Sequence, residues 1–157
     1  MSDAPGPGNG YRVAHVDRLC DSFHRLLGHP LIDSANSGEQ RAAAIFDAEF
    51  VVLSSGLEAD PLFNYANRTA LGLFELEWAQ LVALPARESA EPENQATREQ
   101  LMQQVREQGY IDNYAGVRIS ATGRRFVIER ATVWNVIDED GALHGQAATF
   151  SQWRDLS

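Results

Sequence analysis

The sequence predicts an α+β domain with about five strands, and three observations support that class. Apolar residues recur at spacings of three and four early in the chain, which is the pattern of amphipathic helices. Alternating apolar and polar residues fill the last third, where Thr122-Gly123 and Asp140-Gly141 predict turns between antiparallel strands. The length of 157 residues suits one domain with a substantial core.

The N-terminal part is predicted to contain a tail and two helices. Residues 1–10 are rich in Pro and Gly and have little to bury, so we expect a disordered tail. One apolar helical stripe runs from Tyr11 to Leu27. A second helix is expected over residues 38–46, beginning after Ser37. The helical N-terminal region therefore spans residues 11–48.

The core of the domain is predicted over residues 49–154. Two strands, residues 50–54 and 62–66, lie on either side of a turn rich in Gly, Asp and Pro. Asn67 follows the second strand and is a good cap for the next helix. Short helices come next, and a longer helix covers residues 94–108. Three strands complete the expected order, with no internal repeat.

Composition excludes several classes of protein. The chain has 22 acidic and 13 basic residues and a formal charge of -9, so it would repel a nucleic-acid backbone. The single cysteine, Cys20, cannot form an internal disulfide, and no secretory signal opens the sequence. No apolar run reaches the ~18 residues that a membrane helix needs. We therefore expect a cytoplasmic protein that binds neither nucleic acid nor membrane.

The order and spacing of these elements resemble the PAS fold. Long stretches of the sequence also resemble one particular PAS-related family. The stretches "FVVLSSG", "NYANRTALGLFELEWAQLVALPARESAEP" and "GYIDNYAGVRISATGRRFVIERATVWNVIDEDGALHGQAATF" resemble the MEKHLA domain. This PAS-related family occurs alone in bacteria and algae, and at the C-terminus of plant homeodomain-leucine-zipper proteins. The resemblance covers residues 11–154 and favours the bacterial stand-alone form. It implies a five-stranded antiparallel sheet with short helices on one face and the N-terminal amphipathic helix on the other.

The resemblance also implies a pocket between the sheet and the short helices. It places two guanidinium groups there, and a buried cation needs an anionic partner because leaving it unpaired costs several kcal/mol. A one-residue slip in strand register would reverse these facings. The residues expected to bind a ligand are Arg118, Arg130, Thr132, Trp134, Gln146 and Phe150.

Our hypothesis is a small molecule with a carboxylate, held by Arg118 or Arg130 with Trp134 stacked beside it. The alternative is an internal ion pair between each arginine and a local acid. The acids considered for that pairing are Glu129, Glu107 and Asp112.

No catalytic or metal-binding residues stand out. The acidic residues beside caps and turns read as solvated charges, and no acid falls at metal-ligand spacing from the histidines. Residues 64–109 contain no histidine, which disfavours histidine-ligated haem. Cys20 lies outside the expected core, which disfavours cysteinyl-flavin photochemistry and leaves noncovalent flavin open. The cofactor stays unknown, and an enzyme is not expected.

Three functions remain open at this point. The first is a sensor that binds a small molecule and signals through its N-terminal helix to a homodimer partner or a separate output protein. The second is a ligand-free interaction or dimerisation module, and the third is a small enzyme that uses the pocket. A monomer, in which the first helix simply covers its own sheet, is the alternative to the homodimer.

Overall fold

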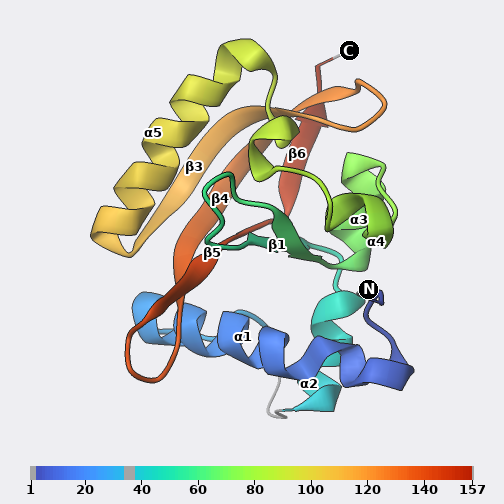
Figure 1. Cartoon of the computed structure of the whole chain (residues 1–157), viewed down its shortest axis with the longest axis vertical. Coiled ribbons are helices and arrows are strands. Elements are labelled where there is room, and N and C mark those ends of the chain that lie inside the picture. Colours follow the sequence, from blue (N-terminus) through green and yellow to red (C-terminus); the bar gives the residue numbers. More distant parts are fainter. Residues whose placement is uncertain (1–2, 34–37, 157) are drawn as a thin grey trace.

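The computed structural model describes residues 3–33 and 38–156, and it confirms the α+β class (Figure 1). Ser37, the expected start of the second helix, lies outside these residues. The disorder expected of residues 1–10 stays a prediction, as do the expected domain limits. The elements, in chain order, are η1 (Pro7–Arg12), α1 (Val13–Leu27), α2 (Glu39–Phe46), β1 (Val51–Ser55), β2 (Phe63–Ala66), α3 (Arg68–Phe74), α4 (Trp78–Leu81), η2 (Ala86–Ser89), α5 (Pro92–Gln108), β3 (Tyr110–Ile119), β4 (Arg125–Ile137), β5 (Leu143–Phe150) and β6 (Gln152–Asp155).

The strands form one antiparallel sheet in the order β2-β1-β5-β4-β3. The short strand β6 follows β5 after Ser151 and pairs with the first part of β4, from Phe126 to Glu129. The last predicted strand is therefore two segments, because the chain bends at Ser151. The five-stranded PAS-like sheet expected from the sequence is confirmed, with β6 as a short addition.

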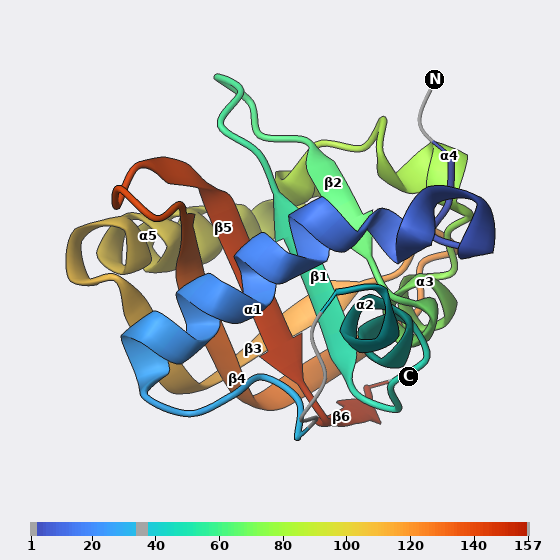
Figure 2. The same ribbon diagram turned by 90° about the horizontal axis from the view of Figure 1, so that it is seen from below.

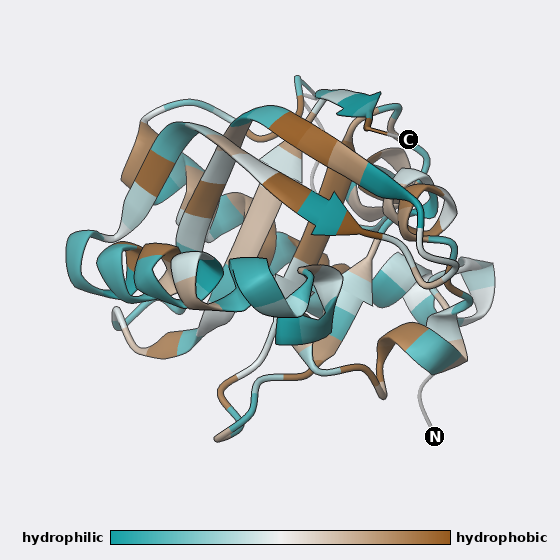
Figure 3. Ribbon diagram, turned by 90° about the horizontal axis from the view of Figure 1, so that it is seen from above, coloured by the Kyte–Doolittle hydropathy of each residue, from teal (hydrophilic) through white to brown (hydrophobic). Residues whose placement is uncertain are grey.

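Helices cover both faces of the sheet. Helix α1 crosses one face, with α2 beside it (Figure 2). Helices α3 and α5 lie on the opposite side, and α5 packs against β3 and β4 (Figure 1). Most of α5 is hydrophilic (Figure 3), and only Leu101, Met102 and Val105 among its residues are buried. We call these two sides the α1 face and the α5 face.

The α1 face is a packed apolar core. The stripe predicted in α1 is buried, and the helix ends at Gly28, which has the left-handed φ of 82° that glycine adopts freely. Phe23 meets Trp134 of β4 edge to face with ring centroids 4.9 Å apart, and the Trp134 Nε1 donates to the Ser22 Oγ at 3.2 Å. Helix α1 thus buries its stripe against its own sheet.

Asn67 ties three elements together, which explains the "YAN" that ends β2. Its Oδ1 accepts hydrogen bonds from the backbone of Ala70, as the predicted cap of α3, and of Val52 in β1. Its Nδ2 donates to the carbonyls of Ile45 in α2 and Phe50. The side chain is fully buried with all of these groups paired, so its role is structural.

Candidate functional site

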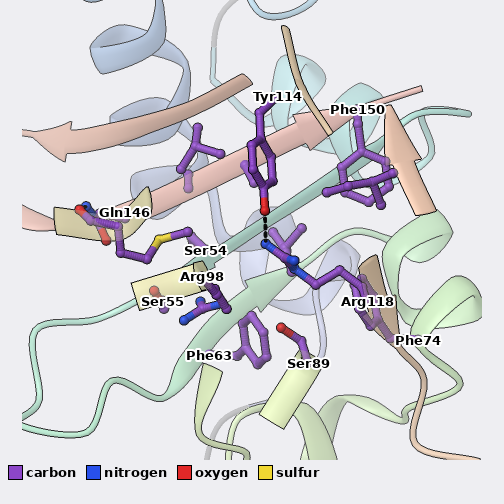
Figure 4. Close-up of a pocket in the computed structure, with 16 residues that line it drawn as sticks. Ser54, Ser55, Phe63, Phe74, Ser89, Arg98, Tyr114, Arg118, Gln146 and Phe150 are labelled. Carbon is purple, nitrogen blue, oxygen red and sulfur yellow. Dashed lines mark hydrogen bonds between the residues drawn. The ribbon is translucent and has the colours of Figure 1, made fainter. Parts of the chain in front are cut away.

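A cavity lies on the α5 face, between the sheet and α5 (Figure 4). Its volume of ≈ 50 Å³ exceeds the roughly 10–15 Å³ that one water molecule needs. Much of its wall is apolar, from Phe63, Phe74, Ile128 and Phe150. A small molecule of a few non-hydrogen atoms fits such a space, and the polar groups in the wall decide which one.

Arg118 of β3 is the most buried charge in this wall, with 7% of its surface exposed. It donates to the Val117 carbonyl at 2.8 Å and to the Tyr114 hydroxyl at 3.2 Å. Within residues 3–33 and 38–156 it forms no ion pair. Because a guanidinium has more N–H donors than these bonds use, Arg118 retains capacity to bind an anion.

Tyr114 reaches Arg118 because β3 is irregular. The pairing of β3 with β4 shifts on both sides of Tyr114, and the neighbouring Asn113 has a left-handed φ of 56°. Gly116 then lies directly under the phenol, where a Cβ atom would collide with the Tyr114 hydroxyl. The phenol of Tyr114 therefore lies along the strand, over Gly116, and both its ring and its hydroxyl contact Arg118.

Arg98 of α5 brings a second guanidinium to the same cavity. Burial and, to a smaller extent, the positive charge of Arg118 together lower the pKa of Arg98 to about 10. Among the residues described, no hydrogen bond or ion pair to the Arg98 side chain is present. Arg98 is not among the site residues predicted from the sequence, although its position one turn before Leu101 and Met102 places it on the buried stripe of α5.

The cavity contains only part of the predicted site. Arg118, Gln146 and Phe150 line it, as expected. Gln146 donates through Nε2 to the Met102 carbonyl at 2.9 Å and to the Asn135 Oδ1 at 3.4 Å, so it also joins β5 to α5. Whether these residues bind a ligand stays a prediction.

The expectation that Arg130, Thr132 and Trp134 point into the pocket is wrong. None of the three lines the cavity, Arg130 is exposed, and Trp134 packs against α1. The cause is Arg130 itself, whose left-handed φ of 53° interrupts the pleat of β4. Ile128, before this point, and Val133, after it, both line the cavity, so the alternation changes phase between them.

The ion pairs considered as the alternative do not reach Arg118. Glu129 pairs with Arg154 at 2.9 Å, and the Glu107 carboxylate accepts a hydrogen bond from Gln103. Asp112 is exposed and forms no ion pair within the part of the chain that is described. The two arginines therefore line the cavity without a carboxylate from those acids beside Arg118.

The other titratable groups singled out in the sequence lie away from this cavity. Cys20 is buried in α1, and burial raises the pKa of its thiol to about 11. His15 of α1 lies 2.9 Å from the Ser54 Oγ of β1, and burial lowers the pKa of His15 to about 4. In the described residues no group of three or more His, Cys, Asp or Glu side chains is placed to hold a metal ion. None of the described helices has both the length and the apolar character required to cross a membrane.

Solved structures with this architecture are PAS domains. A PAS domain from Colwellia psychrerythraea aligns with a TM-score of 0.63 and 17% sequence identity, covering 75% of this chain and 95% of that one. The PAS domain of a LuxR-family transcriptional regulator from Burkholderia thailandensis, solved in complex with ethanol, aligns with a TM-score of 0.54 and 17% identity, covering 73% of this chain and 95% of that one. The fold is thus the PAS fold.

The family follows from sequence. The chain belongs to the MEKHLA domain family, whose profile matches residues 13–155. It is 31% identical over 139 residues to the homeobox-leucine zipper protein HOX9 of Oryza sativa subsp. indica. That match covers 86% of this chain and 16% of HOX9, so the chain corresponds to a small part of its plant relative.

Proposed function

We propose that this domain is a sensor that binds a small carboxylate-bearing molecule in the cavity of the α5 face, with Arg118 as the principal anchor. The observation that carries the proposal is a pair of guanidinium groups, Arg118 and Arg98, in one apolar cavity without an acidic partner among the described residues. Desolvating a cation without a counter-charge is costly, and the like charge nearby adds to that cost. A bound anion would offset both.

The size of the cavity supports a small ligand. Its ≈ 50 Å³ accommodates a few non-hydrogen atoms, and its apolar wall suits a short hydrocarbon part beside the charged group. A PAS domain of similar fold was solved with ethanol, which is a molecule of that size. Another PAS domain of similar fold comes from a two-component sensor histidine kinase, which supports a sensory function.

The output is proposed to pass to a homodimer partner or a separate protein. The apolar stripe of α1 is already buried against the sheet of the same chain, so no second subunit is needed to cover it. The homodimer therefore stays a prediction, which light scattering coupled to size-exclusion chromatography over a range of protein concentrations would decide.

The ligand proposal is tested by ¹⁹F NMR titration with trifluoroacetate, a small carboxylate. We expect saturable binding to the wild-type protein and at least about a tenfold loss of affinity, or 1.4 kcal/mol, in Arg118→Met. Trifluoroethanol, which has a similar size and no charge, is the ligand control and should bind much more weakly.

Arg130→Met is the matched protein control, since it removes the same side chain from an exposed position of the same sheet. Its affinity for trifluoroacetate should equal that of the wild type. Equal affinity in Arg118→Met, or absence of binding to the wild type, would refute the proposed anchor.

A further inference from the structure

Resting on the anion site proposed above, we propose that the bound anion bridges Arg98 to Arg118 and so clamps the first half of α5, residues 92–100, onto the sheet. Occupancy of the cavity would then be transmitted through α5. The helix expected from the sequence to carry the signal is α1, which lies on the opposite face.

The two halves of α5 are attached to the sheet very differently. The second half carries the buried residues Leu101, Met102 and Val105. It also has direct hydrogen bonds to the sheet: the Met102 carbonyl accepts from Gln146, and the Arg106 carbonyl accepts from the Asn135 Nδ2 at 3.3 Å. The backbone N–H of Asn135 donates to the Gly109 carbonyl at 2.8 Å, just after the helix.

The first half has little that holds it. Residues 92–100 are exposed or only partly buried, and the Gln95 side chain bonds to Ala90 in the preceding loop rather than to the sheet. One contact comes just before the helix, where Glu91, whose side chain is 18% exposed, pairs with Arg125 of β4, whose side chain is 46% exposed. This pair holds the residue before α5, and among the described residues no ion pair joins residues 92–100 themselves to the sheet. Arg98 is therefore the residue of this half that can connect it firmly to the interior.

Arg98 also lies in the wall that the cavity shares with a second hollow. This smaller hollow has a volume of ≈ 20 Å³, and the residues that line both are Ser55, Arg98, Met102 and Gln146. Of these four residues, Arg98 has the longest side chain, and it comes from the loosely attached half of α5. A displacement of this half would open the cavity to the solvent at Arg98, and its return would place the guanidinium over the ligand.

The charges explain why a ligand would change the position of the helix. Without an anion, Arg98 and Arg118 repel each other, and this repulsion opposes close packing of the first half of α5. An anion between them replaces the repulsion with two attractions. Because these groups are partly shielded from water, the change is larger than it would be at the surface.

Hydrogen-deuterium exchange with mass spectrometry tests the clamp, comparing the protein with and without saturating trifluoroacetate. We expect exchange in the segment 92–100 of the wild type to slow about threefold or more on binding, while α1 is unchanged. In Arg98→Met, trifluoroacetate should bind about three- to tenfold more weakly, and at saturation the slowing should be lost. Arg130→Met removes an exposed arginine of β4 that lines neither hollow and should behave like the wild type.

The outcomes separate the clamp from the site itself. If trifluoroacetate binds but exchange in 92–100 is unchanged, or slows equally in Arg98→Met, the clamp is wrong and the site remains. If trifluoroacetate fails to bind to the wild type, the proposed function is wrong, and the clamp fails with it.

Discussion

The two faces of the sheet use polar side chains in opposite ways. On the α1 face, the Trp134 Nε1 donates a hydrogen bond to the Ser22 Oγ, and the aromatic ring of Trp134 is fully buried against Phe23. On the α5 face, Arg98 and Arg118 share a cavity with no acidic partner among the residues described. The first arrangement is complete within the chain. The second becomes complete when an anion is added.

This difference locates function on one side of the domain. A packed apolar face contributes free energy of folding, whereas unpaired charge in a cavity lowers stability and is typical of binding sites. Substitutions on the α1 face should therefore change stability without changing anion affinity. Substitutions of the cavity arginines should do the reverse.

The largest effect is expected from Trp134→Ala. Removal of this buried side chain should lower the free energy of unfolding by about 3–5 kcal/mol, because it leaves a cavity against α1 and the Ser22 hydroxyl without its donor. Chemical denaturation measures this loss. Trifluoroacetate affinity at low temperature, where the variant is folded, should stay within about twofold of the wild type. A large loss of affinity would mean that the two faces are not independent.

An acid-dependent loss of stability is expected next, from His15 on the α1 face. Burial lowers its pKa in the folded state from 6.5 to about 4, so the unfolded chain takes up the proton first as the pH falls. The contribution of neutral His15 to the free energy of unfolding is fully present above pH 6.5 and is lost as the pH falls towards 4. The total loss amounts to about 3 kcal/mol.

The difference between the wild type and His15→Asn isolates this effect, since other groups titrate in both proteins. Thermal melts between pH 7 and pH 4.5 should show a shallower decline in the variant. Parallel declines would show that His15 is not buried in the neutral form.

The smallest effect is expected from Arg98→Met in the absence of anions. Stability should stay within about 1 kcal/mol of the wild type or rise slightly, because the substitution removes a charge that Arg118 repels and that forms no ion pair within the described residues, its acidic neighbour Glu99 included. Chemical denaturation in a low-salt buffer without carboxylates measures this difference in the free energy of unfolding. A loss above 2 kcal/mol would reveal an internal partner for Arg98 and would remove the contrast between the faces.

Much of the fold could be predicted from the sequence because its signals are local. The stripe of α1, the Asn67 cap and the Gly-containing turns each depend on neighbouring residues. The site was predicted in part, since Arg118, Gln146 and Phe150 reach the cavity.

The remainder depends on features that are not local. The left-handed Arg130 shifts the phase of β4, and a strict two-residue alternation cannot anticipate it. Arg98 looks like a solvated helix charge until the packing of α5 against β3 and β4 turns it inwards.

The proposed binding of a small anion to the arginines in the cavity of the α5 face can be observed in a crystal soaked in sodium bromide. Bromide is small enough for the cavity, and its anomalous scattering identifies it. We predict a bromide peak in the cavity beside Arg118 and Arg98. Peaks confined to surface arginines, with only water in the cavity, would contradict the account.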